Sequence, residues 1–197
     1  MSNAKELKCG AEQPEKYLPV LEDKNVGLVV NHTSLVGGIH LVDVLLENQI
    51  KVKKIFAPEH GFRGEAAPGE EIRSGVDSKT GVPVVSLYGE TRKPTPEQLE
   101  GIDLVVFDIQ DVGCRFYTYI STLHLVIEAC AENHIPLVVF DRPNPNGDYV
   151  AGPVLKKEFQ SFVGMDCIPV VHGCTVGELA QMINEEKWHT AETKCEL

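Results

Sequence analysis

Short apolar runs alternate with stretches of helical periodicity along most of this chain. Six runs rich in Val, Leu and Ile have the pattern of strands buried on both faces, and they span residues 26–30, 52–56, 83–87, 103–107, 136–140 and 167–171. Four helices are predicted from apolar spacing or capping residues, over 39–48, from Thr95, over 119–133 and from Thr175 to about Lys187. The order of these elements predicts an α/β fold.

Strands separated by helices predict a mostly parallel sheet, because each crossover returns the chain to the same edge. The length of 197 residues fits one domain with a core of its own. We expect residues 1–25 to form a polar amino-terminal segment and residues 26–197 to form this domain.

Charge and composition make some classes of binding partner unlikely for this chain. The formal net charge of −11 disfavours nucleic acid and anionic membrane surfaces, since both favour a basic protein face. The six cysteines show neither zinc spacing nor the disulfide framework of a small secreted domain. No apolar stretch approaches the roughly 18 residues of a membrane span. Residues 1–10 are polar and show no leader, which leaves the compartment undetermined.

One stretch, residues 55–64, has the features of an active-site loop. It begins as an apolar strand and then places Glu59, His60 and Arg63 within five positions. The glycines and prolines in and after it disfavour a helix, and the sequence remains irregular to about residue 81. A long irregular connection inside a compact domain is usually functional or disordered, and the acid, imidazole and guanidinium favour function. We therefore predict that this stretch forms the floor of an active site.

Polar side chains follow five of the six predicted strands. In chain order these clusters are Asn31 and His32; Glu59, His60 and Arg63; Asp108, Asp111 and Arg115; Asp141, Arg142, Asn144 and Asn146; and His172. Parallel strands place their carboxyl ends at one edge of the sheet, which is where open α/β sheets bind ligands. We expect the five clusters to converge there.

The sequence lacks the motifs that mark several common classes of enzyme. No glycine-rich dinucleotide or P-loop motif is present, and no serine-hydrolase elbow, so we expect no nucleotide cofactor. Asp108 and Asp111 could hold magnesium for phosphoryl transfer, which makes a metal-dependent phosphatase the weakest alternative. No pair among His32, His60 and His172 has helical metal-ligand spacing. We expect neither a metal nor a cofactor.

The remaining pattern, carboxylates amid arginine, tyrosine and asparagine, suits a polyhydroxylated ligand. Asn and Arg side chains bond hydroxyls and carboxylates, while Tyr117 or Tyr119 can pack on a sugar face. Glycoside hydrolysis usually uses two carboxyl groups, one of which is kept protonated. We predict Glu59 as the acid, with Asp108 or Asp111 as its partner.

Simpler roles are open for four of these residues. Asp108 could cap the turn that follows it, and Asp141 could pair with Arg142 or Arg115. Arg63 could clamp the long loop, and Tyr117 could belong to the core.

Four segments, residues 57–64, 108–119, 141–145 and 169–178, resemble the DUF1343 proteins, which include exo-β-N-acetylmuramidases of the NamZ type. The resemblance implies a Rossmann-like amino-terminal domain with helices on both faces of its sheet. It implies release of N-acetylmuramic acid from the non-reducing end of peptidoglycan fragments. It also implies Glu59 and His60 at the reaction centre. The pocket residues that it implies are Arg63, Arg115, Tyr117, Asp141, Asn144 and His172, beside which we place Asn31 and Asn146 as further substrate-binding candidates.

The resemblance also raises an alternative. It implies a further carboxyl-terminal domain that helps to wall the cleft, and we expect residues 1–197 to comprise the amino-terminal domain only. A non-catalytic sugar-binding module is therefore the second hypothesis. A peptidoglycan-derived saccharide as partner favours a periplasmic or secreted location, although a cytoplasmic one stays open. The lactyl carboxylate of muramic acid would offer an arginine a bidentate partner.

Overall fold

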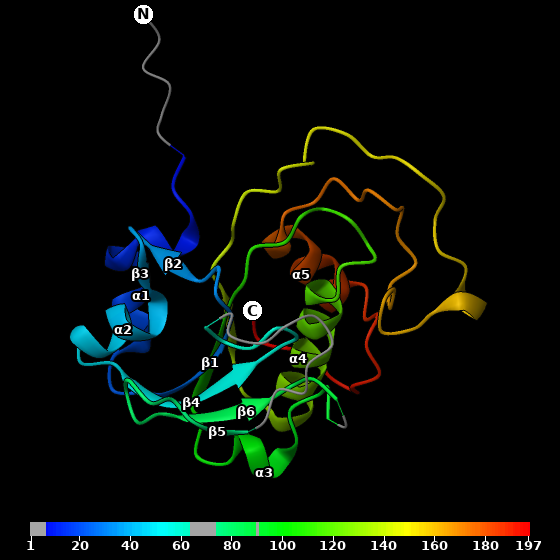
Figure 1. Ribbon diagram of the computed structural model, residues 1–197. Coiled ribbons are helices and arrows are strands. Elements are labelled where there is room, and N and C mark those ends of the chain that lie inside the picture. The colour runs from blue at the N-terminus through cyan, green and yellow to red at the C-terminus, as the bar shows by residue number, and fades with distance from the viewer. Residues whose placement is uncertain (1–6, 64–73, 90) are drawn as a thin grey trace, which may run out of the picture.

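The computed structural model describes residues 7–63, 74–89 and 91–197 (Figure 1). Its main sheet has six strands in the order β5-β6-β4-β1-β7-β8. Their bounds are β5 (Gly75–Val76), β6 (Pro83–Ser86), β4 (Lys51–Ala57), β1 (Asn25–Val30), β7 (Leu104–Asp108) and β8 (Leu137–Val139). All pairings in this sheet are parallel except that of β5 with β6. A separate antiparallel pair consists of β2 (Leu35–Val36) and β3 (Ile39–His40).

Helices cover both faces of the sheet. On one side lie α1 (Pro14–Leu21) and α2 (Leu41–Glu47), and on the other α4 (Tyr119–Asn133) and α5 (Val176–Glu185) (Figure 1). The short helices are α3 (Pro96–Leu99), η1 (Gly10–Glu12) and η2 (Lys157–Phe159). The predicted α/β fold with a mostly parallel sheet and helices on both faces is confirmed. No helix in the described ranges is both long and apolar enough to cross a membrane.

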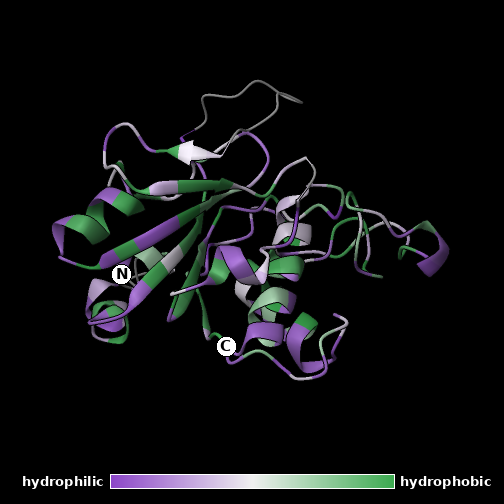
Figure 2. Cartoon of the chain, turned by 90° about the horizontal axis from the view of Figure 1, so that it is seen from below, coloured by the Kyte–Doolittle hydropathy of each residue, from purple (hydrophilic) through white to green (hydrophobic). Residues whose placement is uncertain are grey.

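Alternate residues of the central strands enter two different cores. In β7, Val105 and Phe107 pack with α4 and α5, whereas Leu104 and Val106 pack with α1 and α2. Because both faces are buried, the strand is apolar throughout, which is the signal that made it recognisable in the sequence. Figure 2 shows several strands that are hydrophobic along most of their length, while hydrophobic and hydrophilic residues alternate along the helices.

The predicted strand at residues 167–171 is wrong. In the structure this segment lies outside the sheet, and only Val171 forms isolated bridges, with Cys114 and Ala151. Pro169 lacks the N–H that a ladder requires, so the segment packs among loops instead. The sixth strand of the sheet is β5, whose two residues carry no recognisable strand pattern in the sequence.

The segment before residue 26 contributes to the core. Helix α1 begins with Pro14 at its first turn and buries Tyr17 and Leu21, and the Tyr17 ring lies 4.5 Å from that of Phe140. Residues 1–6 and part of the predicted active-site loop, residues 64–73, lie outside the described ranges.

The parallel strands end close together at one edge. Ala57 pairs with Ser86, Val30 with Asp108, and Phe107 with Val139. The residues that follow β1, β4, β6, β7 and β8 therefore emerge side by side, although they are far apart in sequence. This carboxyl edge is where the fold positions a candidate site.

A cluster of four charged side chains fastens the loop after β4. Arg63 donates from Nε and Nη2 to the two carboxylate oxygens of Asp77, at 3.0 and 2.9 Å, and it also contacts Asp43, which pairs with Lys79 at 2.6 Å. The hydrogen bonds from Arg63 lower the pKa of Asp77 to about 2, from an ordinary value of 3.8. Asp77 is therefore more easily ionised in the folded chain than in the unfolded one.

This difference predicts a stability change at low pH. The Asp77 pairing stabilises the fold at pH values above 3.8, and the contribution is lost as the pH falls through the folded pKa of about 2. The loss corresponds to about 2 kcal/mol of unfolding free energy. Urea unfolding of the wild type and of Asp77→Asn should therefore differ above pH 4 and converge at pH 2. Asp23→Asn, at a carboxylate whose side chain is 93% exposed, is the matched control and should track the wild type. A constant difference across this range would contradict the assignment.

Candidate functional site

Glu59 lies two residues beyond the end of β4, at the carboxyl edge of the sheet. It is half-buried, and the hydroxyl of Thr118 donates a hydrogen bond to its Oε2 at 2.8 Å. The backbone turns sharply after it, with positive φ angles of 71° at His60 and 76° at Gly61. A non-glycine residue with such a φ is uncommon and costs backbone energy, so the turn fixes where Glu59 and His60 stand.

Two phenols flank this carboxylate. Tyr88 follows β6, and hydrogen bonding and charge from Glu59 raise the pKa of its phenol. Tyr119 begins α4, and burial raises the pKa of its phenol, an effect that the Asn31 side chain opposes and the Glu59 charge reinforces. Glu59 thus accepts a hydrogen bond from Thr118, and its charge raises the pKa of both the Tyr88 and the Tyr119 phenol.

Asn31 completes this group from the end of β1. It is fully buried, and its Oδ1 accepts hydrogen bonds from the backbone N–H and the hydroxyl of Thr33, at 2.9 and 2.6 Å. Its Nδ2 has no hydrogen-bond partner among the described residues. His40 lies 2.9 Å from the Asn31 carbonyl oxygen through Nε2 and holds the backbone from the other side. Because the Nδ2 atom is also buried, an ordered water molecule is the partner that suits it.

Asp108 forms a buried ion pair with Arg142. Its carboxylate accepts from Nε and Nη2 of Arg142 at 2.6 and 3.0 Å, and the side chains of Asp108 and Arg142 are 0% and 8% exposed. Burial raises the pKa of Asp108, against the opposing effect of Arg142. The hydroxyl of Ser34 donates to the Asp108 carbonyl, and Arg142 also donates to the Leu35 carbonyl at 3.2 Å. The role that the structure displays for Asp108 is to join strand ends.

Asp111 is buried beside His172. Its Oδ2 accepts from the Gly113 N–H at 2.6 Å and lies 3.4 Å from Nε2 of His172, whose Nδ1 accepts from the Cys174 N–H at 3.3 Å. The other carboxylate oxygen, Oδ1, has no partner among the described residues. Asp111 therefore keeps hydrogen-bonding capacity that Asp108 has used.

Asp141 caps helix α5. Its two oxygens accept from the Thr175 hydroxyl and the Gly177 N–H, each at 2.8 Å. A carboxylate at this position interacts favourably with the helix dipole. Asp141 makes no ion pair with Arg142 or Arg115 among the described contacts, and Arg142 pairs with Asp108 instead.

The two asparagines after β8 hold loops together. Asn144 donates to the Cys174 carbonyl and accepts from the Asn146 N–H, each at 2.8 Å, and it packs against Gly113 so closely that a side chain there would collide. Asn146 donates to the Val112 carbonyl at 2.8 Å. Both side chains therefore connect the polar loops to one another.

The last two candidates differ in exposure. Arg115 donates to the carbonyls of Pro153, at 2.9 Å, and of Ile168, so it bridges two loop segments. Tyr117 is 47% exposed beside Phe116, with ring centroids 5.6 Å apart, which places it on the surface rather than in the core.

The structure thus brings Glu59 and Asn31 into one group, and Asp111, Asn144, Asn146 and His172 into a second. Thr118 and Tyr88 were not identified from the sequence. Thr118 lies within a segment that resembled the known family, and Tyr88 follows a predicted strand, but neither carries a charge that would mark it. The described residues contain no group of three or more His, Cys, Asp or Glu side chains able to hold a metal.

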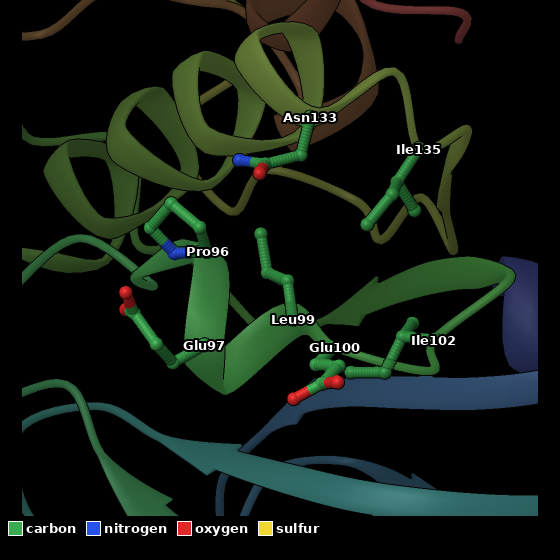
Figure 3. Close-up of a pocket in the computed structure, with 7 residues that line it drawn as sticks. All are labelled: Pro96, Glu97, Leu99, Glu100, Ile102, Asn133 and Ile135. Atoms are coloured by element: carbon green, nitrogen blue, oxygen red, sulfur yellow. The ribbon is translucent and has the colours of Figure 1, made fainter.

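Hollows lie near several of these elements. One, of about 490 Å³, lies at the carboxyl edge, and its lining includes His32, His40, Arg63 and Lys79. A second, of about 590 Å³, lies between β8 and α5, and its lining includes Asp141 and Glu178. Figure 3 shows another of about 450 Å³ at the opposite edge, where Ile102 precedes β7 and Ile135 precedes β8. Strand-end polar residues line the first two hollows, His32 in one and Asp141 in the other, but Glu59 lines none of the three.

Known proteins similar to this chain share its organisation. The family model described as exo-β-N-acetylmuramidase NamZ, N-terminal, matches residues 26–197. A peptidoglycan β-N-acetylmuramidase NamZ from Bacillus subtilis (strain 168) is 52% identical over 86% of this chain and 42% of its own length.

Two solved structures have the same fold as this chain. Two DUF1343 family proteins from Bacteroides fragilis superpose with TM-scores of 0.85 and 0.88, at 46% and 44% identity. They match 95% and 96% of this chain and 49% and 48% of their own chains. This chain therefore spans less than half of the length of these relatives, and it belongs to the NamZ amino-terminal domain family.

Proposed function

We propose that this chain carries the acid-bearing part of an exo-β-N-acetylmuramidase, a glycoside hydrolase that releases N-acetylmuramic acid from the non-reducing end of peptidoglycan fragments. The observation that supports it most is the Glu59 carboxyl group, held at the ligand-binding edge of the sheet by Thr118 and flanked by Tyr88. The activity named for the Bacillus subtilis relative agrees with this chemistry.

In the proposed reaction Glu59 protonates the glycosidic oxygen as the sugar departs. Glycosidases pair such an acid with a second carboxylate that acts as a base or nucleophile, or stabilises the positive charge at the anomeric carbon. Asp111 fits this part better than Asp108, because one of its oxygens has no partner whereas Asp108 is engaged by Arg142. His172 lies beside Asp111, with Nε2 3.4 Å from its carboxylate.

A sugar-binding module without catalysis is the second candidate. One observation favours it: most polar strand-end side chains are engaged in internal hydrogen bonds rather than free to take part in a reaction. Such a module would be stabilised by muramic-acid sugars without releasing a product. The phosphatase alternative receives no support from the described residues, which contain no cluster of three metal-binding side chains.

Replacing the acid tests the catalytic proposal. Glu59→Gln keeps the shape of the side chain but removes the proton donor, so turnover of a chromogenic N-acetylmuramic acid glycoside should fall by about 10²-fold or more. Glu97→Gln, at the opposite edge of the sheet, is the matched control and should retain full activity. Unchanged turnover in Glu59→Gln would remove Glu59 from the reaction.

The two aspartates should separate stability from activity. Asp108→Asn leaves a buried Arg142 without its counter-charge, which should cost about 3–5 kcal/mol of unfolding free energy. Asp111→Asn keeps the hydrogen bond from Gly113, so it should lower turnover with a smaller loss of stability. Denaturant unfolding and initial rates measured on the same preparations check both effects. If Asp108→Asn were as stable as the wild type, the ion pair would not have the structural role assigned to it.

Thr118 should act by holding Glu59. Thr118→Val removes the donated hydrogen bond at nearly constant volume, so turnover should drop by about 10-fold, the value of an interaction worth about 1.4 kcal/mol. Thr118→Ser keeps the hydroxyl and should restore turnover. Turnover in Thr118→Val equal to that of the wild type would count against the contact.

A further inference from the structure

The loop that carries Glu59 makes a tight turn directly after β4. The Gly61 N–H donates to the Pro58 carbonyl at 3.1 Å, which closes the turn, and Glu59 lies within it. Strand β4 holds the chain before the turn. After the turn the chain is held through Phe62, which is buried. The contacts of Phe62 therefore help to determine where Glu59 stands.

Two neighbouring groups contact the Phe62 ring. The guanidinium carbon of Arg63 lies 4.5 Å from the ring centre. The centroid of the His40 ring lies 5.0 Å from that of Phe62, and the two ring planes meet at 88°. This edge-to-face geometry is one of the arrangements that aromatic pairs prefer. Phe62 thus contacts its own neighbour in the loop and, through His40, a different part of the chain.

His40 is held by two hydrogen bonds that also define where its proton lies. Its Nδ1 accepts from the Val42 N–H at 3.3 Å, which caps α2, and its Nε2 lies 2.9 Å from the Asn31 carbonyl oxygen. A ring nitrogen that accepts from an N–H carries no proton, and one that faces a carbonyl oxygen carries a proton. His40 is therefore a neutral imidazole with its proton on Nε2. In this form it joins the end of β1, the first turn of α2 and the loop that bears Glu59.

Protonation would disrupt this arrangement, because a second proton on Nδ1 would face the Val42 N–H. Burial lowers the pKa of His40 from its ordinary value of 6.5, and the charge of Arg63 also lowers it, whereas the Asn31 carbonyl and Asp43 oppose the shift. The titratable groups around the ring are Asp43 from α2, Arg63 from the loop after β4, and two further residues that line the same hollow, His32 and Lys79. His40 therefore keeps its neutral form at pH 7 and loses it only on acidification.

We infer that neutral His40 is a positioning residue: by holding Phe62 it fixes the outgoing end of the turn and so sets where Glu59 stands. It touches neither the substrate nor the reacting atoms in this role. Its part in a reaction rests on the proposed function, whereas its hold on Phe62 can be measured without a substrate.

Nuclear magnetic resonance of the chain with ¹⁵N-labelled histidine tests the hold on Phe62. At pH 7 the proton of His40 should be on Nε2. On acidification the ring should titrate below pH 6.5, and the Phe62 ring signals should change in step with it. In His40→Gln, which has no ring to protonate, this part of the Phe62 change should vanish.

His134→Asn is the matched control for these spectra. His134 is an exposed histidine after α4 with a left-handed backbone, which asparagine tolerates. The Phe62 change should therefore be the same in this variant as in the wild type. A proton on Nδ1 of His40 at pH 7, or Phe62 signals that do not follow the His40 titration, would overturn the inference.

Turnover of the chromogenic N-acetylmuramic acid glycoside tests whether this hold serves the reaction. His40→Asn keeps a side-chain oxygen that can cap α2 but is too short to reach Phe62. Its helical circular dichroism should match that of the wild type, while turnover should fall by about 10-fold or more, because small displacements of a reacting group are costly. Below pH 6.5 the wild type should lose more of its turnover than His40→Gln, since only the wild type has a ring at this position to protonate.

The outcomes separate the positioning role from the proposed function. If the wild type hydrolysed the glycoside and His40→Gln had the same pH–rate profile, His40 would not position Glu59, and the proposed function would stand. If the wild type showed no turnover at any pH while Phe62 followed the His40 titration, the proposed function would fail and the hold of His40 on the loop would stand.

Discussion

A buried ion pair between Asp108 and Arg142 holds the carboxyl edge of the sheet together. It joins the end of β7 to the loop after β8, and Arg142 reaches β2 through the Leu35 carbonyl. Two charges removed from water are tolerated only where their hydrogen-bonding needs are met, and here the guanidinium meets both oxygens of the carboxylate. The loops that bear the candidate site are therefore joined by this ion pair. Loss of either partner would leave the other charge buried and unpaired.

Around this pair, polar residues divide into those that hold loops and those left for a ligand. Asp141 caps α5, and Asn144 and Asn146 fasten the loops that surround Asp111. These contacts are internal and make the edge rigid. Glu59 is half-buried at the same edge, and its one hydrogen bond among the described side chains comes from Thr118. A rigid support beneath a few free polar groups is the arrangement that positions a substrate with little loss of entropy.

The sequence predicted the sheet well because its central strands are buried on both faces and carry continuous apolar runs. The same signal failed at residues 167–171, where an apolar run packs among loops and Pro169 interrupts any ladder. Helix α1 was missed because Pro14 and Pro19 obscure its apolar face, and β5 has only two residues.

The sequence predicted at which edge of the sheet the candidate site lies, but not which side chains contact one another there. Topology alone places Glu59 and Asn31 at the same end of the sheet. The partner of Asp108 could not be chosen among several arginines, since the choice depends on loop paths with no sequence period. The Thr118 hydroxyl was missed because an uncharged side chain gives no signal until its neighbour is known. The catalytic and binding roles of the candidate residues stay predictions.

The central claim, that this chain acts on muramic-acid-terminated sugars through Glu59, is tested most directly with a natural-type substrate. The purified chain would be incubated with a disaccharide that carries N-acetylmuramic acid at its non-reducing end, and the products would be identified by mass spectrometry. We expect free N-acetylmuramic acid to accumulate with the wild type and not with Glu59→Gln. An intact disaccharide that nevertheless raises the melting temperature of the wild type would contradict catalysis by this chain and favour the binding module.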